Sequence, residues 1–277
     1  MDARFGGTGG GIAWPRLTPA VRVLLIVNVG VFLLNALTKG LFGLNLGEWF
    51  GLTWSGLGDG FGLGVLRLLT YQVVHSFNDP LHLLFNMLML YFFGTFVEGA
   101  IGTRRMVWLY VIAGVVGGVV QLLLGRVMGA PDVVTIGASG ALYGIMVYAA
   151  CLAPRMTVIM LEFPIELRWL VGIMVGLGVY LAYVGLVTGH TGGVAHGGHL
   201  GGALWGYLAY KLPAGSMSWD PLAKVRRWSA DRERKSAHHK QQVLDELLEK
   251  VHREGLGALT PAERRFLDKA SQEMRRK

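Results

Sequence analysis

The chain has 277 residues, of which 52% are hydrophobic and only 16% are charged. A soluble globular protein carries roughly 25% charged residues, so this composition excludes an ordinary soluble domain and favours a chain built largely within a membrane. The formal net charge is +8. We attribute it to basic residues that flank membrane spans rather than to a nucleic-acid-binding surface.

Apolar stretches of about 20 residues recur along the chain and predict transmembrane helices. They lie near residues 20–38, 81–99, 105–125, 137–153, 168–188 and 193–212. We therefore predict an all-α polytopic membrane protein with a bundle of about six transmembrane helices. The domain boundaries follow from this pattern: a flexible cytoplasmic tail at 1–18, a membrane domain at 19–213, and a basic linker with a cytoplasmic helical hairpin at 214–277.

One Thr-Pro pair and one Asp-Pro pair mark two predicted helix starts. Thr18 and Asp79 each precede a proline, which suits an N-cap residue followed by proline at the first helical position. Between the first two spans, residues 41–67 are rich in glycine and aromatic residues and contain too few contiguous apolar residues to span. We expect a loop there that lies partly in the membrane interface, where tryptophan is favoured.

The distribution of lysine and arginine predicts the orientation in the membrane. Basic residues precede the first span and occupy every second loop after it: Arg4, Arg16, Arg22, Arg104, Arg105, Arg155 and Arg168. The loops on the opposite side carry fewer. Because basic loops stay in the cytoplasm, both termini are expected there.

Polar side chains occur early in the second, fourth and sixth spans. His82 and Asn86 lie in the second, Ser139 in the fourth and His199 in the sixth. In the predicted orientation these spans all run inward from the extracytoplasmic side, so the four residues should lie at a similar shallow depth. A polar group in hydrocarbon is costly unless it has a partner or a function. Ser139 and His199 therefore suggest a nucleophile and its general base.

Glycines spaced four residues apart should bring these helices together, because such ridges allow close backbone approach in lipid. They are Gly140 and Gly144 on the fourth span, and Gly198, Gly202 and Gly206 on the sixth. Tyr143, one turn after Ser139, could then pack against the imidazole. The His82 and Asn86 side chains and the Ser139 backbone N–H are candidate donors for an oxyanion hole. No Asp or Glu lies early in these spans except Asp79, so we expect a dyad rather than a triad.

Three motifs resemble those of the rhomboid family of intramembrane serine proteases: the Gly-x-Ser-Gly at 137–140 with Tyr143, the His-x-x-x-Asn at 82–86, and the His-x-x-Gly-x-x-x-Gly at 199–206. The resemblance covers residues 20–212. It implies Ser139 as nucleophile, His199 as general base, and His82, Asn86, Tyr143 and Gly137 as oxyanion or supporting residues.

Other positions also match the family's pattern. Arg67 and His75 stand at the expected spacing before His82, and Glu98 resembles a polar residue that the family keeps near the inner end of the second span. Leu66 departs from the tryptophan that many members have before this arginine. His196 is a second candidate base, but its following residues do not match the motif.

The resemblance further implies a bacterial-type enzyme of the inner (plasma) membrane that needs neither metal nor other cofactor. Its substrates would be proteins with a single transmembrane helix, cut near the extracytoplasmic side. Two alternatives remain open. One is a metal site built from His75, His82, His196 and His199. The other is a catalytically silent rhomboid-like protein that binds or traffics clients.

The last 38 residues, 240–277, predict a pair of helices. Apolar residues recur at helical spacing from Val243 to Val251, glycines at 255 and 257 end this helix, and Thr260 to Glu263 form a capping box with Pro261 at the first helical position. Phe266 and Leu267 are expected to face inward. We interpret this hairpin as a folded appendage that self-associates or binds a cytoplasmic partner. The basic stretch before it would lie near anionic lipid headgroups.

Overall fold

The structure is a computed structural model that describes residues 15–60, 62–160, 163–189, 194–213, 242, 244–255, 257, 259–261, 263–265 and 267. Most of the predicted tail at 1–18, the basic linker from residue 214, Val243 and Phe266 lie outside the described residues. The chain divides into two compact units, Met1–Ser218 and Trp219–Lys277. Each unit is considered separately below.

Every apolar stretch predicted to span the membrane is helical in the first unit. The helices are α1 (Pro19–Phe42), α4 (Pro80–Met89) continuing through a π-helical turn η4 (Leu90–Gly94) into α5 (Thr95–Ile101), α6 (Thr103–Val127), α7 (Ser139–Leu152), α8 (Leu167–Thr188) and α9 (His196–Lys211). Within the described residues, α1, the Pro80–Ile101 segment, α6 and α8 are long and apolar enough to cross a membrane. At 14 and 16 residues, α7 and α9 are shorter.

The predicted interfacial loop between α1 and α4 folds into a series of short helices. They are α2 (Leu46–Phe50), η1 (Ser55–Gly58), η2 (Leu63–Leu66), α3 (Arg67–Thr70) and η3 (Tyr71–Val73). The Arg67 guanidinium holds the short helices of this region together: it donates hydrogen bonds to the Gly51 carbonyl at 3.1 Å and to the Asp59 carboxylate at 2.7 Å. Leu52 also exchanges two backbone hydrogen bonds of 2.9 Å with Thr135, so the loop is joined to the segment that precedes α7.

The start of α1 differs from the sequence prediction. Thr18 occupies the N-cap position, but its side chain makes no capping bond to the helix. Its hydroxyl instead donates to Glu98, and the Glu98 carboxylate accepts from the backbone N–H groups of Ala20 at 2.9 Å and Val21 at 3.0 Å. A carboxylate satisfies these otherwise orphaned donors more strongly than a hydroxyl. Since Thr103 also donates to Glu98 at 2.7 Å, one carboxylate joins α1, α5 and α6.

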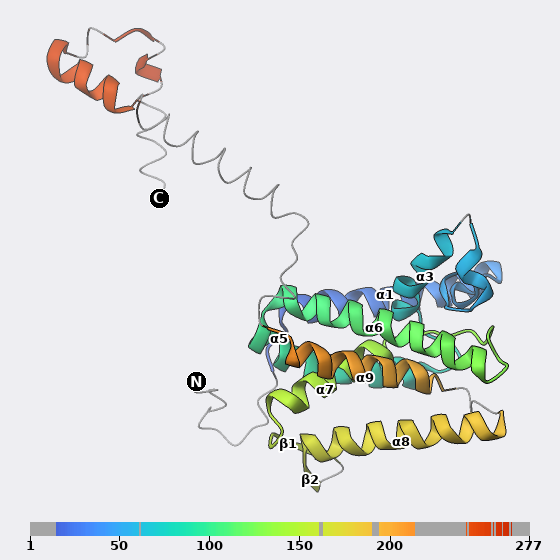
Figure 1. Cartoon of the computed structure of the whole chain (residues 1–277). Helices are drawn as coiled ribbons and strands as arrows, with labels where there is room; N and C mark the ends of the chain where they lie inside the picture. Colours follow the sequence, from blue (N-terminus) through green and yellow to red (C-terminus); the bar gives the residue numbers. More distant parts are fainter. Residues whose placement is uncertain are drawn as a thin grey trace. The chain divides into compact units, whose positions relative to one another are not determined.

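Helix α9 lies between α6 and α7, as Figure 1 shows, and glycines make both contacts close. A Cβ atom added at Gly202 would stand 1.8 Å from the Gly140 carbonyl oxygen of α7. On the other side, a Cβ added at Gly117 of α6 would stand 2.5 Å from the Gly198 carbonyl oxygen. The predicted glycine ridges on the fourth and sixth spans are therefore confirmed as contact surfaces. A further glycine surface on α6 completes the packing.

A two-stranded sheet follows α7, and the sequence did not predict it. Strand β1 (Thr157–Met160) pairs with the antiparallel β2 (Phe163–Glu166), which leads directly into α8. Residues of both strands near the bundle, Val158 and Ile165, pack against the hydrophobic core.

The C-terminal unit contains the predicted helix and capping box. Residues 244–254 are helical, and Gly255 follows with φ of 83°. The Thr260 backbone N–H donates to Glu263 at 2.7 Å, while the Glu263 backbone N–H donates to the Thr260 hydroxyl at 3.3 Å. Lys250 joins the two segments through a 3.0 Å ion pair with Glu263.

Candidate active site

The Ser139 and His199 side chains meet at one end of the α7–α9 contact. The distance from Ser139 Oγ to His199 Nε2 is 2.8 Å, which is a hydrogen bond. Tyr143 stacks on the imidazole with its ring centroid 4.3 Å away and the two planes 5° apart. The glycine contacts described above explain this proximity, because they leave room for only short side chains between the two helices.

Both residues lie close to a helix start. Ser139 is the first residue of α7, where the backbone N–H groups have no acceptor within the helix and the helix dipole favours negative charge. His199 is in the first turn of α9. The start of α9 is held by Gln121 of α6, whose side-chain oxygen accepts from the Gly198 backbone N–H at 3.1 Å.

His75 connects Asn86 to the segment before α7. Its Nε2 lies 2.9 Å from Asn86 Nδ2 and 3.4 Å from the Ala138 backbone nitrogen. Both neighbours are N–H donors, so Nε2 is the acceptor and the imidazole proton resides on Nδ1. Burial, together with the neighbouring His82, lowers the pKa of His75 to about 4, which keeps this ring neutral near pH 7.

This arrangement leaves Asn86 with donor capacity. The amide nitrogen carries two hydrogens, and His75 accepts only one of them. Because Asn86 also lines the cleft that contains Ser139, its second hydrogen is available to a bound group. His75 is therefore a residue that orients the Asn86 amide.

His82 lies beside Gly137, the first residue of the serine motif. Gly137 has φ of 115°, and a Cβ there would stand only 2.9 Å from His82 Cε1. Both the backbone conformation and the space thus require glycine. The Asp79 side chain accepts from the His82 backbone N–H at 3.1 Å, which confirms the predicted N-cap of α4.

A cleft of about 790 Å³ opens over these side chains. His82, Asn86, Ser139, Tyr143 and His199 all line it, as expected for residues at a shared depth. Apolar side chains from α4, α7 and α8 form much of the remaining wall: Leu81, Phe85, Met89, Leu142, Met146 and Met174. The cleft thus joins a polar end at Ser139 and His199 to an apolar surface suited to hydrocarbon.

The four histidines weighed above as metal ligands, His75, His82, His196 and His199, are not arranged as a metal site. The ring centroid of His196 lies 6.4 Å from that of His199, and His196 does not line the cleft. Among the residues that the structure describes, no group of three or more His, Cys, Asp or Glu side chains is arranged to hold a metal ion.

Sequence reasoning did not single out three polar residues that the structure holds by hydrogen bonds inside the membrane unit. They are Gln121, described above; Tyr71, whose hydroxyl donates to the Gly114 carbonyl at 2.6 Å; and Gln72, whose amide donates to the Leu68 carbonyl at 2.8 Å. Gln121 had a usable signal, because it is a polar residue inside an apolar span. The other two lie in the loop before α4, where polar residues are ordinary.

Comparison with known proteins agrees with the architecture. The Rhomboid domain profile matches residues 63–213, and a profile described as a family of unknown function matches residues 231–273. Rhomboid protease GlpG of Haemophilus influenzae is 26% identical over 153 residues, which are 55% of this chain and 74% of GlpG. Rhomboid protease GluP of Bacillus subtilis is 30% identical over 148 residues, which are 52% of this chain but only 25% of GluP.

Proposed function

Because the chain belongs to the rhomboid family of intramembrane proteases, we propose that it is a serine endopeptidase that uses a Ser139–His199 dyad. The observation that carries this proposal is the 2.8 Å hydrogen bond between Ser139 Oγ and His199 Nε2. A serine hydroxyl is a weak nucleophile by itself, and a hydrogen-bonded imidazole is the usual activating base.

The reaction begins when Ser139 Oγ attacks the carbonyl carbon of the scissile peptide and its proton passes to His199 Nε2. The tetrahedral intermediate then collapses, the C–N bond breaks, and His199 returns the proton to the departing amine. The acyl group remains as an ester on Ser139. His199 then takes a proton from a water molecule as the water attacks the ester carbon; the bond from that carbon to Ser139 Oγ breaks, and His199 returns the proton to Oγ, which releases the acid and frees the serine.

Negative charge on the intermediate needs preorganised donors. The candidates are the His82 ring, the second Asn86 amide hydrogen and the N–H groups at the start of α7. His75 and Gly137 act as supports, His75 by orienting Asn86 and Gly137 by giving room to His82.

Stacking supplies the orientation that a third acidic residue provides in a triad. Among the described residues, no hydrogen bond joins a carboxylate to His199, whereas Tyr143 covers one face of its ring. The His199 imidazole is thereby held in the plane that directs Nε2 toward the serine.

The substrates that fit this site are single-span membrane proteins, cut near the extracytoplasmic end of the span. The cleft is apolar beyond the dyad, which suits a helix leaving the bilayer, and its polar end suits locally unwound backbone. With the termini cytoplasmic, the chain would comprise a tail at 1–18, a protease domain at 19–213 in the inner membrane, and a cytoplasmic appendage at 214–277. Its segment 240–277 would self-associate or bind a partner.

The decisive experiment reconstitutes the full chain in liposomes with a single-span test substrate. Ser139→Ala should abolish cleavage and also labelling by a fluorophosphonate, while Ser55→Ala, at an exposed serine that does not line the cleft, should retain both. Cleavage that survives in Ser139→Ala but stops with a chelator would overturn the dyad in favour of a metal site. An unreactive Ser139 and no cleavage of several substrates would instead support a client-binding protein.

A further inference from the structure

The β1–β2 hairpin has a firmly packed base. Val158 and Ile165 face each other across the two strands and both pack against the bundle core. Leu167, directly after β2, is fully buried, and its backbone N–H donates to the Met156 carbonyl at 2.8 Å. The hairpin is therefore held in one position relative to the ends of α7 and α8.

The part of the hairpin beyond this base exposes large apolar side chains. Ile159 is 78% exposed and Phe163 is 71% exposed. Ile159 pairs with Pro164, and Met160 pairs with Phe163, so Ile159 and Phe163 lie in adjacent pairs and point to opposite faces. An apolar surface on both faces of a two-stranded sheet would be unfavourable in water.

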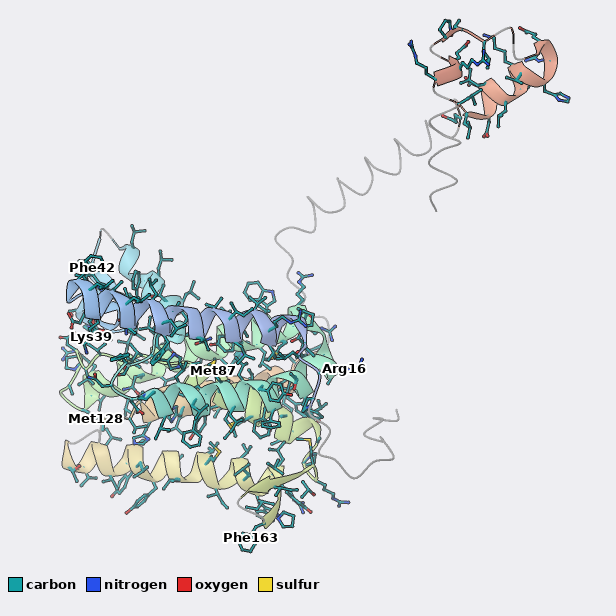
Figure 2. All side chains as sticks on the ribbon, turned by 180° about the vertical axis from the view of Figure 1, so that it is seen from behind. Arg16, Lys39, Phe42, Met87, Met128 and Phe163 are labelled. Atoms are coloured by element: carbon teal, nitrogen blue, oxygen red, sulfur yellow. The ribbon has the colours of Figure 1, made fainter. Side chains whose placement is uncertain are left out.

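The hairpin also lies at a particular level of the molecule. In Figures 1 and 2 it stands beside the first turns of α8 and extends sideways from the bundle, across the helix axes rather than along them. Phe163 marks its outer end in Figure 2. Because α8 is long and apolar enough to cross a membrane, its first turn marks the membrane boundary, and the hairpin lies at that boundary.

The residues at this level suit a headgroup region. Trp169, in the first turn of α8, is 61% exposed, and the Arg168 guanidinium lies 5.3 Å from the centroid of its ring. Arg168 also pairs with Glu166 at 2.6 Å, and Arg155 is exposed nearby in sequence. Tryptophan and arginine are both favoured where acyl chains meet headgroups, and the cationic groups complement anionic lipids.

We propose that the β1–β2 hairpin is an interfacial anchor. Ile159 and Phe163 insert into the boundary between headgroups and acyl chains of the leaflet that surrounds the start of α8. The occupant of this apolar surface is thus lipid. A second copy of the chain fits less well, because one partner surface cannot cover both faces of the hairpin. This inference rests on the membrane-embedded helices and does not depend on catalysis.

The anchor has a consequence for the cleft. The same helix that follows the hairpin carries Met174 into the cleft wall. An anchored hairpin would hold the start of α8 at a fixed depth in the bilayer, at the end of the bundle opposite to Ser139.

The test measures the depth of the hairpin in vesicles of zwitterionic and anionic phospholipid. The full chain with Cys151→Ala receives one new cysteine, which carries an environment-sensitive fluorophore. With Phe163→Cys, a nitroxide high on the acyl chain should quench more strongly than one near the chain end, and aqueous iodide should quench weakly. Val179→Cys, at a 54% exposed position within α8, should favour the deep nitroxide, while Glu249→Cys, at a 69% exposed side chain of the C-terminal unit, should respond to iodide.

Three results would overturn the proposal. In the first, the Phe163 site responds only to iodide, like the Glu249 site. In the second, it responds mainly to the deep nitroxide, like the Val179 site. In the third, it is protected from both iodide and the nitroxides, which indicates a protein partner. A second pair of variants tests insertion of the hairpin directly. Adding Ile159→Asp to the Phe163→Cys protein should raise iodide quenching severalfold, whereas adding Thr157→Ser should leave it unchanged. Unchanged thermal unfolding in detergent would show that the hairpin base still packs in both variants.

Discussion

The membrane unit contains two kinds of helix. α1 and α8 have 24 and 22 residues and expose most of their apolar surface. α7 and α9 have 14 and 16 residues, pack through glycines and carry Ser139 and His199 near their starts. The difference indicates that the helices in contact with lipid are not the helices that carry the proposed catalytic residues. Ser139 and His199 sit on short helices in the interior, where a polar side chain finds partners, whereas α1 and α8 face the hydrocarbon.

Glycine packing should show the largest contrast between the two kinds of helix. Gly202→Ala on α9 places a methyl group 1.8 Å from the Gly140 carbonyl oxygen, whereas Gly176→Ala on α8 meets nothing within 4 Å. Overpacking typically costs about 1–3 kcal/mol, and a clash with backbone belongs at or above the top of that range. We expect Gly202→Ala to lose thermal stability in detergent and fluorophosphonate labelling, with Gly176→Ala close to wild type. Equal stability of the two variants would contradict this distinction.

Loss of the proposed oxyanion donor Asn86 should be the next largest effect. Asn86→Ala should lower kcat by about 10²–10³-fold, as removal of such a donor does elsewhere, with a smaller change in KM. His75→Ala should act through the same amide and lower kcat by about tenfold, equivalent to about 1.4 kcal/mol of lost orientation. His75→Gln offers an acceptor to Asn86 and should restore part of the rate. A His75→Ala enzyme that is slow only because it is unfolded would show reduced labelling of Ser139 and a lowered unfolding temperature.

Loss of the ring stacked on His199, the proposed general base, should give a smaller effect. Tyr143→Ala removes a ring 4.3 Å from His199, and aromatic pairs contribute about 0.5–1.5 kcal/mol, so the rate should fall by up to about tenfold. Tyr143→Phe keeps the stack and should stay close to wild type in steady-state cleavage. Equally slow cleavage by the two variants would contradict the stacking role and assign the effect to the Tyr143 hydroxyl.

The smallest effect on cleavage is expected from changes in the C-terminal unit, which should leave Ser139 and His199 unaffected. Hydrogen bonds from the Thr260 backbone N–H and from Lys250 hold the pKa of Glu263 below its usual 4.5. Because the folded pKa is depressed, the stabilisation is fully present above the unfolded value and is lost as the pH falls through the folded value. Hydrogen exchange at the Thr260 amide should therefore lose protection below about pH 4.5, beyond the intrinsic pH effect on exchange. Glu263→Gln should make this protection independent of pH in the same range.

Local patterns predicted the features that depend on neighbours in sequence. The spans, the Asp79 cap, the Thr260–Glu263 capping box and the glycine ridges all follow from residues a few positions apart. The Ser139–His199 contact required only that two glycine-rich spans meet in the right register. These contacts were predictable because lipid leaves helices few ways to satisfy polar groups and pack closely.

Features that depend on long-range partners were missed or misassigned. Thr18 looks like a cap in sequence, but Glu98, 80 residues away, supplies the capping oxygens. Asn86 looks like a free donor, yet the structure shows one of its hydrogens given to His75. The β1–β2 hairpin escaped because its strands have only four residues each and lie in the short stretch between the spans predicted at 137–153 and 168–188, where no period-2 pattern is long enough to predict a strand.

The shortness of α7 has a consequence for the bilayer. At 1.5 Å per residue, its 14 residues extend about 21 Å, well below the roughly 30 Å of a hydrocarbon core, while α1 and α8 reach about 33–36 Å. We therefore expect α1 and α8 to absorb hydrophobic mismatch through tilt, rather than the helices that carry Ser139 and His199. Changes in lipid chain length should reach Ser139 only indirectly, by altering how the outer helices lean against the α6–α9–α7 layer.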